Sequence, residues 1–300
     1  MILAGIDLGT NTFDLLIVDA SKSHWKLLHQ EKQWVGLGID FFDSSCISSK
    51  AMQSATACLT QFKAKCVSMG VEKQRLVGTS ALRDAVNAVE FLNALDEALN
   101  ISVEIVSGER EAELVFMGLN SLTNFPDHGL IMDVGGGSTE LIAFQTQTML
   151  GLNSLNIGVT RLMAHIDINQ VLTHTDVQVF EQWFNTALNL KKQHFPALIG
   201  SAGPFETFYH LLYKQSLPFR SLRELPIELL NPLLDELIYS TYKHRQTLES
   251  VPDLRKKYLH LAALQIRWVI KTFGVNHVYT CTAGLTDGII AAQKLSEMSN

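Results

Sequence analysis

The stretch Leu130–Ala143 constrains the fold most, because it predicts two strands joined by a glycine-rich turn. Its first three residues are apolar and suit a buried strand, and Asp133 stands at the end of that strand. Ser138 and Thr139 add hydroxyl donors before the second strand begins. The pattern predicts a phosphate-binding hairpin whose carboxylate holds a metal ion beside the phosphate. The alternative is a tight hairpin whose glycines serve only turn geometry.

Three consecutive glycines explain why this turn suits an anion. Without side chains, the backbone N–H groups can approach an anion closely, and φ > 0 is permitted. The candidate phosphate-binding residues of this hairpin are Gly135, Gly136, Gly137, Ser138 and Thr139.

The chain opens with a second copy of this pattern, which predicts two similar domains. Asp7 follows the apolar run Ile2–Ile6, and the strand-like run Phe13–Val18 follows the loop. Asp7 and Asp133 are 126 residues apart, and a chain of 300 residues suits two domains of ordinary size. We therefore expect each domain to offer a phosphate loop to one cleft. The candidate phosphate-binding residues of the first loop are Gly9, Thr10, Asn11 and Thr12.

Five stretches, taken together and in order, resemble known proteins. The two loops alone resemble those of the acetate kinase/sugar kinase/Hsp70/actin superfold. The full set resembles, more narrowly, the family of exopolyphosphatases and guanosine pentaphosphate phosphatases (Ppx/GppA) in a short, two-domain form. The five stretches are Gly5–Val18, Gly78–Asn87, Ser107–Gly118, Met132–Leu141 and Asn156–Leu162.

The resemblance implies an α/β fold of two ribonuclease H-like domains with a cleft between them. The first domain would span residues 1–125, and a terminal helix at about 286–300 would pack back on it. The second domain would span residues 126–285. Apolar spacing in the second domain predicts two long helices, over Glu228–Ser250 and Asp253–Phe273.

Two residues have catalytic roles that the resemblance implies. Glu111 matches the glutamate of the family pattern Ser-Gly-x-x-Glu-Ala-x-Leu, which is taken as the catalytic base that orients a water for in-line attack. Arg83 matches the arginine of Ser-Ala-x-Arg-x-Ala-x-Asn and would clamp a phosphate by a two-pronged contact. From spacing alone, Glu111 could instead serve the helix dipole, and Arg83 could be a surface neighbour of Asp84. Arg161 also matches a family position, either as a second phosphate-facing cation or as a surface arginine.

The predicted cofactor is Mg²⁺ (or Mn²⁺), bound directly or through water by three carboxylates: Asp7, Asp133 and Glu140. A further loop of small residues, Gly200–Pro204, precedes a predicted helix. In the superfold, such a loop borders the nucleotide or polyphosphate site. Its candidate backbone donors are Ser201, Ala202 and Gly203.

Composition limits the partners. The formal net charge of −6 provides no global basic field, so we expect no nucleic acid, and any polyphosphate must be bound by local loops and metal ions. The four cysteines have no zinc-binding spacing, which favours reduced thiols and a cytoplasmic location. No apolar segment reaches about 18 residues, so no membrane span is expected. A homodimer is the expected assembly.

Two departures from the family pattern leave the function open in detail. Asp14 stands where relatives tend to carry a neutral, basic or His residue, and Lys257 replaces the acid of an Arg-x-Asp pattern. The resemblance implies hydrolysis of inorganic polyphosphate, guanosine pentaphosphate, or both. One alternative is an ATP-dependent kinase or ATPase of the same superfold. Another is a non-catalytic sensor that binds polyphosphate or guanosine tetra- or pentaphosphate through intact loops.

Overall fold

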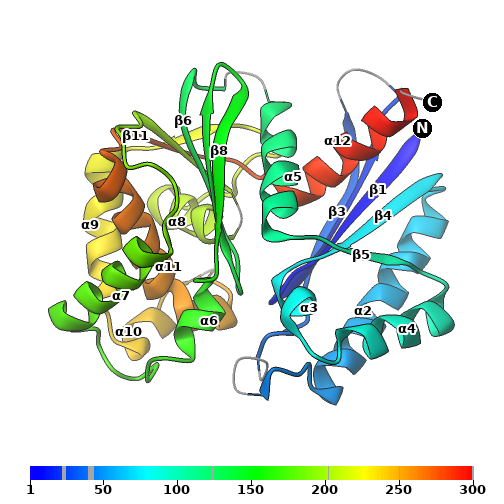
Figure 1. Ribbon diagram of the computed structural model, residues 1–300, viewed down its shortest axis with the longest axis horizontal. Coiled ribbons are helices and arrows are strands. Elements are labelled where there is room, and N and C mark those ends of the chain that lie inside the picture. Colours follow the sequence, from blue (N-terminus) through cyan, green and yellow to red (C-terminus); the bar gives the residue numbers. More distant parts are fainter. Residues whose placement is uncertain (22–24, 40–43, 123–124, 202, 250, 299–300) are drawn as a thin grey trace. The chain divides into compact units, whose positions relative to one another are not determined.

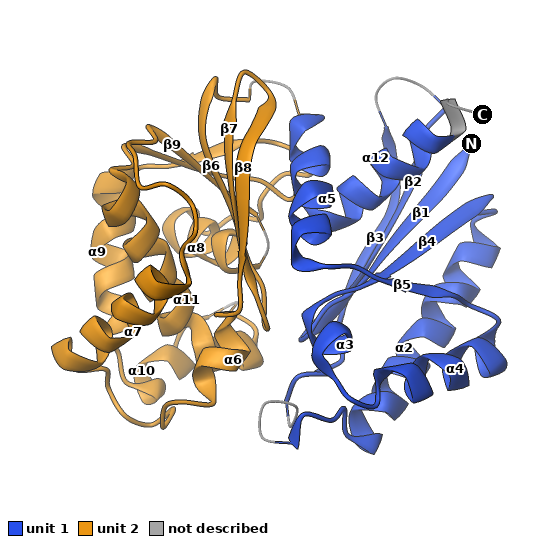
Figure 2. Cartoon of the chain, in the orientation of Figure 1, with its two compact units in different colours: residues 1–121, 284–300 blue, residues 122–283 orange. Residues whose placement is uncertain are grey.

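The computed structural model describes the whole chain except residues 22–24, 40–43, 123–124, 202, 250 and 299–300 (Figure 1). It divides into two compact units, which Figure 2 colours separately. Unit 1 comprises Met1–Ser121 and Gly284–Asn300, and unit 2 comprises Leu122–Ala283. The unit boundaries thus fall after residues 121 and 283, four and two residues before the positions taken from the sequence.

Unit 1 is built on a five-stranded sheet in the order β3-β2-β1-β4-β5. The first three strands form an antiparallel meander, whereas β4 and β5 run parallel to β1. Alternate residues of β1 and β2, all of them apolar, join a core cluster with α2, α3 and α4 on one face of the sheet. The element bounds are β1 Ile2–Leu8, β2 Thr12–Asp19, β3 Lys26–Trp34, α2 Ser49–Ser68, β4 Lys73–Gly78, α3 Ser80–Asp84, α4 Ala88–Leu99, β5 Val103–Ile105, α5 Gly108–Asn120 and α12 Leu285–Met298.

The other face of this sheet is covered by α12, which packs on β1 and crosses α5 (Figure 1). Glycine permits the close crossing: a Cβ on Gly288 would come within 1.8 Å of the Leu114 carbonyl oxygen. The side chain of Gln293 donates from Nε2 to the Ala4 carbonyl oxygen of β1 at 2.9 Å, inside the buried interface. The last helix is therefore part of the first sheet's packing, although it is distant from β1 in sequence.

Unit 2 is built on a six-stranded sheet in the order β10-β11-β9-β6-β7-β8. Its antiparallel β6, β7 and β8 repeat the meander of unit 1, and β9 runs parallel to β6. A large apolar cluster, dominated by α11, covers one face. The element bounds are β6 His128–Val134, β7 Thr139–Gln145, β8 Thr148–Leu155, α6 Val159–Met163, α7 His174–Ala187, β9 Ala197–Ser201, α8 Gly203–Tyr213, β10 Arg223–Leu225, α9 Ile227–Ile238, α10 Tyr242–Gln246, α11 Asp253–Phe273 and β11 His277–Thr280.

The long helix predicted over Glu228–Ser250 is wrong, because the structure breaks it into α9 and α10. Arg245 is fully buried near the break, and its Nη1 donates to the Ser240 carbonyl oxygen at 2.7 Å. Its Nε donates to the Lys256 carbonyl oxygen at 2.9 Å. Burial lowers the pKa of Arg245 to about 10. The guanidinium thus satisfies the Ser240 carbonyl, which a continuous helix would have paired internally, and also binds a carbonyl of α11.

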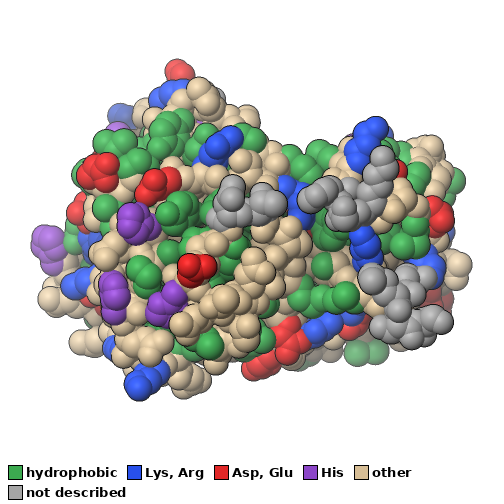
Figure 3. Space-filling view, turned by 90° about the horizontal axis from the view of Figure 1, so that it is seen from above, with side chains coloured by type: hydrophobic (Ala, Val, Ile, Leu, Met, Phe, Trp, Pro, Cys, Tyr) green, Lys and Arg blue, Asp and Glu red, His purple; other side chains and the backbone are tan. Residues whose placement is uncertain are grey.

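The surface of the protein shows no continuous basic region on the face drawn in Figure 3. Acidic and basic side chains are interspersed over the face drawn in Figure 3, and the Lys and Arg side chains coloured there form no continuous patch. Among the described residues, no helix combines the length and the apolar character that crossing a membrane requires.

Candidate functional site

The glycine-rich turn of unit 2 connects β6 to β7 and carries Asp133 at its entrance. The N–H of Gly135 donates to the Ser138 carbonyl oxygen at 3.0 Å and closes the turn. None of the three glycines adopts the left-handed region, although the sequence allowed it. At Gly135, a Cβ would lie 3.0 Å from the Ser138 carbonyl oxygen, so the missing side chain there serves close packing rather than backbone handedness.

The carbonyl groups of this turn are bound by the segment that leads into α6. The N–H of Val159 donates to the Gly135 oxygen at 3.0 Å, and the N–H of Thr160 donates to the Gly136 oxygen at 2.8 Å. The N–H of Gly158 donates to the Gly137 oxygen at 3.2 Å. All three carbonyls of the glycine run are thereby occupied from one side.

The amides of the same turn remain open. Within the described part of the chain, the N–H groups of Gly136, Gly137 and Ser138 donate to no protein acceptor. Three consecutive amides without a protein acceptor, beside a bound row of carbonyls, are donors available to an anion. The predicted phosphate-binding role of this turn thus has a backbone geometry that suits it.

The predicted metal ligands of unit 2 stand in one row across the sheet. Glu140 lies opposite Asp133 in the β6–β7 register, and Ser201 and Ser154 extend the row on either side. Glu140 is 1% exposed and accepts a hydrogen bond from the Ser154 hydroxyl at 2.8 Å. Like charges directly opposite each other in a sheet repel, so a cation beside this pair would be stabilising.

The donor set fits Mg²⁺ by its chemistry, since hard carboxylate oxygens are the ligands that this ion prefers. Among the described residues, no group of three or more His, Cys, Asp or Glu is arranged to enclose a metal ion. Mg²⁺ usually binds through one or two carboxylates and keeps several waters. In unit 2, Asp133 and Glu140 are the two carboxylates that would hold such an ion, with water and phosphate oxygens as its other ligands.

The hydroxyl of Thr139 has a different partner from the one predicted. It donates to Gln265 Oε1 on α11 at 2.7 Å, and the residue is 1% exposed. Because side chains alternate along β7, Thr139 faces the apolar cluster while Glu140 faces the opposite side. The expectation of a phosphate-binding hydroxyl at Thr139 is corrected to a structural one: it fixes the start of β7 against α11.

The third small-residue loop leads from β9 to α8. The Ser201 hydroxyl donates to the Ala283 carbonyl oxygen at 3.1 Å, and Ala202 lies outside the described residues. Gly203 begins α8, and a Cβ on it would come within 2.4 Å of Nη2 of Arg255. This guanidinium also donates from Nη1 to the Thr207 hydroxyl at 2.7 Å.

Arg255 is a candidate residue of the third small-residue loop that the sequence patterns did not single out. Lys257 stands where the family pattern has an acid, whereas Arg255, two residues earlier, lies against Gly203 at the start of α8. Its place in the Arg-x-Asp pattern was the signal that could have identified it.

The first loop, in unit 1, repeats the design of the second. The N–H of Gly9 donates to the Thr12 carbonyl oxygen at 3.0 Å, as Gly135 does to Ser138. The Thr10 carbonyl oxygen accepts from the Gly38 N–H at 2.9 Å. The Asn11 carbonyl oxygen accepts from the backbone N–H groups of Val35 and Gly36, which follow β3. A separate segment again holds the carbonyl side of the turn.

Asp14, the acid that departs from the family pattern, lies opposite Asp7 in the β1–β2 register. It therefore occupies in unit 1 the position that Glu140 occupies in unit 2. Lys32 of β3 compensates it, with Nζ 3.4 Å from Asp14 Oδ1, and Thr12 Oγ1 donates to Asp14 Oδ2 at 3.3 Å. The additional charge beside Asp7 is thus paired within the sheet.

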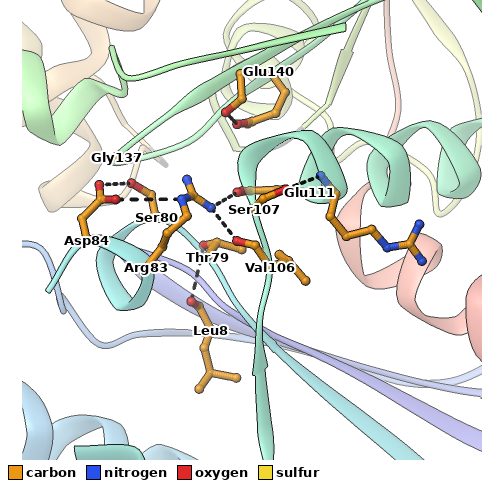
Figure 4. Close-up of polar contacts among 12 residues, drawn as sticks. Leu8, Thr79, Ser80, Arg83, Asp84, Val106, Ser107, Glu111, Gly137 and Glu140 are labelled. Atoms are coloured by element: carbon orange, nitrogen blue, oxygen red, sulfur yellow. Dashed lines mark hydrogen bonds and ion pairs between the residues drawn. The ribbon is translucent and has the colours of Figure 1, made fainter. Parts of the chain in front are cut away.

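The two predicted catalytic residues meet in unit 1 (Figure 4). Arg83 of α3 donates from Nη1 to Glu111 Oε2 at 3.1 Å and to the Val106 carbonyl oxygen at 2.9 Å. Ser107 caps α5 by accepting from the Arg110 N–H at 3.2 Å, which places Glu111 at the fourth position of the helix. Glu111 is 8% exposed.

The neighbouring Glu109 performs the ordinary task of an acid at a helix start. A hydrogen bond from its own backbone amide, and then one from the Ser107 hydroxyl, hold the pKa of the Glu109 carboxyl below its usual range. Glu111, by contrast, points to Arg83 in Figure 4. Hydrogen bonds at the helix start therefore account for Glu109, whereas Glu111 is held by a cation from another element.

Comparison with known protein families shows to which family the chain belongs. The sequence model of the Ppx/GppA phosphatase family matches residues 16–297. The chain belongs to the Ppx/GppA phosphatase family. The match confirms the resemblance that the five sequence stretches carried.

Two solved structures are similar to this chain and agree with its assignment to the family. An exopolyphosphatase from Cytophaga hutchinsonii is 29% identical, and the alignment covers 99% of this chain and 98% of that one with a TM-score of 0.91. The Aquifex aeolicus member of the Ppx/GppA family is 21% identical, with the same coverages and a TM-score of 0.84, and shows the shared fold. The predicted fold class of two α/β domains is confirmed.

Proposed function

We propose that this Ppx/GppA protein hydrolyses the terminal phosphoanhydride of inorganic polyphosphate, guanosine pentaphosphate, or both. The observation that carries the proposal is the run of three open amides at Gly136, Gly137 and Ser138. These donors suit the closely spaced oxygens of a terminal phosphate. The 29% identical relative, which is described as an exopolyphosphatase, supports the same reaction class.

In unit 2, the turn amides would hold the terminal phosphate, and Asp133 with Glu140 would hold Mg²⁺ beside it. The ion, when bound, would neutralise phosphate charge and polarise a phosphoryl oxygen. Glu140 is kept in place by the Ser154 hydroxyl, so the carboxylate is oriented before any ligand arrives. Preorganised donors of this kind supply most of the rate in phosphoryl transfer.

In unit 1, Glu111 would orient the attacking water. As the water oxygen bonds to the terminal phosphorus, its proton passes to the Glu111 carboxylate, and the bond from phosphorus to the bridging oxygen breaks. The shortened polyphosphate or guanosine tetraphosphate leaves with that bridging oxygen. Arg83 places a fixed positive charge next to this carboxylate and would neutralise charge developing on the transferred group.

The decisive experiment is release of inorganic phosphate from four substrates: short polyphosphate, long polyphosphate, guanosine pentaphosphate and ATP, each with and without Mg²⁺. We expect Mg²⁺-dependent release from at least one of the first three and little from ATP. Release mainly from ATP would favour a kinase or ATPase of the same superfold. Binding of polyphosphate without any release would favour a sensor, and either result would overturn the proposal.

A further inference from the structure

The strongest feature that the proposed reaction does not use is the segment that supports the glycine turn. A peptide unit is planar and trans, so its C=O and the following N–H point in opposite directions. Fixing the carbonyl of Gly135 therefore fixes the direction of the Gly136 amide, and the same holds for the next two peptides. The three bound carbonyls and the three open amides belong to the same three peptide planes.

Each of these three peptide planes is held at its carbonyl oxygen by a different set of hydrogen-bond donors. Val159 N–H holds the first plane, and the N–H groups of Thr160 and Arg161 hold the second. The third plane, which ends in the Ser138 amide, is held by the Gly158 N–H and by a side chain: Arg161 Nε donates to the Gly137 oxygen at 2.9 Å.

This contact gives Arg161 a role besides the two that the sequence left open, a phosphate-facing cation and a surface arginine. Its Nε is committed to the turn's own backbone, on the carbonyl side. Arg161 is half-buried, and its backbone amide is also bound to the turn, at 3.2 Å from the Gly136 oxygen. Main chain and side chain of one residue thus hold two successive peptides.

Gly158 allows the supporting segment to approach this closely. A Cβ at residue 158 would lie 2.4 Å from main-chain atoms of Gly136 and Gly137, far inside any real contact. Those atoms are backbone and cannot rotate away, so a side chain at this position would displace the turn itself. The turn needs such support because consecutive glycines have more conformational freedom to lose than any other residues.

We infer that Gly158 and Arg161 are positioning residues, which keep the Gly136–Ser138 amides directed at a bound phosphate by locking the carbonyls behind them. If the Gly137–Ser138 peptide rotates, the carbonyl oxygen takes the place of the Ser138 N–H, and attraction to an anion becomes repulsion. Arg161 acts through hydrogen bonding by Nε rather than through its charge. The inference rests on the proposed function only in naming phosphate as the ligand.

The geometry of side chains gives a sharp test of this role. In glutamine, Nε2 is attached to Cδ, as Nε is in arginine, so Arg161→Gln keeps a donor at the same place without the charge. Arg161→Lys keeps the charge but carries a methylene at that place, and Arg161→Met keeps neither. If Arg161 positions the turn, the Gln variant should bind phosphate more tightly than the Lys and Met variants. If Arg161 contacts phosphate directly, the Lys variant should bind more tightly than the Gln and Met variants.

The measurement is the affinity for tripolyphosphate with Mg²⁺, by calorimetry, in full-length protein carrying Glu111→Gln so that any turnover is suppressed. We expect Arg161→Met and Arg161→Lys to weaken binding by about 10- to 100-fold, the range typical when a residue that orients binding groups is lost. Arg161→Gln should recover most of the loss. The same substitutions at Arg223, an exposed residue of β10, are the matched controls.

Further outcomes separate this inference from the proposed function. If wild type releases no phosphate but binds tripolyphosphate with the Gln-above-Lys ranking, the hydrolase proposal fails and the inference stands. A Lys-above-Gln ranking, or variants that all bind like wild type, would overturn the inference and leave the hydrolase proposal intact. Absence of tripolyphosphate binding by the wild-type chain would overturn the inference, whereas the hydrolase proposal is decided separately by phosphate release from the other substrates. Gly158→Ala should weaken binding as well, with thermal unfolding checking that the variant is folded.

Discussion

Arg83 Nη1 lies 3.1 Å from Glu111 Oε2, and this ion pair joins α3 to the first turns of α5. The side chains are only 20% and 11% exposed, so neither charge is fully solvated. Removing one partner of such a pair leaves the other charge poorly compensated. Tests of Glu111 should therefore use a substitution that preserves the contact with Arg83.

Glu111→Gln is such a substitution, because the amide oxygen can still accept from Arg83 while the group no longer takes a proton. We expect kcat for phosphate release to fall by about 10²- to 10⁴-fold, the usual contribution of a general base, with KM changed by only about a few fold. Steady-state kinetics on the substrate that wild type hydrolyses best would measure both constants. Glu113→Gln on the same helix, which pairs with Arg110 at 2.6 Å, is the control. Unchanged kcat in Glu111→Gln would remove this residue from the mechanism.

Asp133→Asn tests the carboxylate pair of unit 2. The substitution keeps size and hydrogen bonding but removes one charge beside Glu140, so a divalent cation loses part of its attraction. We expect the Mg²⁺ concentration for half-maximal activity to rise by about tenfold or more, in line with the loss of one charged ligand. A titration of activity against Mg²⁺ gives this value directly. Asp127→Asn, at an exposed position of the same unit, should titrate like wild type. A wild-type response in Asp133→Asn would contradict the assignment.

Lys32 and Asp14 provide a test of the compensation in unit 1. Removing the ammonium with Lys32→Gln leaves Asp14 opposite Asp7 without its partner, and like charges across a strand pair are destabilising. We expect a loss of about 0.5–1 kcal/mol in the free energy of unfolding, since the pair is partly exposed. The double variant Asp14→Asn/Lys32→Gln should regain most of that loss in denaturant unfolding. Equal stability of the single variant and wild type would show that the pair contributes nothing.

The sequence was informative wherever a local pattern determined the structure. Two apolar runs, an aspartate and glycines were enough to predict both hairpins. The correspondence of Asp14 with Glu140, however, follows from strand register, which becomes visible only when each hairpin is built. Thr139 was misassigned for the same reason, because the alternation of side chains along β7 decides which face it meets.

Long-range packing accounts for what the sequence did not reveal. The segment 158–161 supports a turn more than twenty residues earlier, and no periodicity reports such backbone contacts. The break between α9 and α10 depends on Arg245 reaching the carbonyl oxygen of Lys256 in the next helix. An arginine in an amphipathic pattern is expected on the surface. Nothing in the neighbouring sequence therefore indicated that Arg245 is fully buried.

The last prediction concerns His260, which is fully buried on α11 and whose ring nitrogens have no hydrogen-bond partner among the described residues. Burial, and secondarily the charge of Arg245, lower the pKa of His260 from 6.5 to about 3. The unfolded chain therefore binds a proton that the folded chain refuses between these values, so stability is full above about pH 6.5 and falls as the pH is lowered toward about 3. At 1.36 kcal/mol per pKa unit, lowering the pH from 7 to 5 should cost the wild-type protein about 2 kcal/mol of unfolding free energy through this residue.

His260→Leu removes the titrating group together with an unsatisfied polar ring. Between pH 7 and pH 5, its unfolding free energy should therefore fall by about 2 kcal/mol less than that of wild type. Urea unfolding at the two pH values measures the difference, His244→Leu at an exposed position controls for general histidine effects, and parallel pH profiles of His260→Leu and wild type would refute the account.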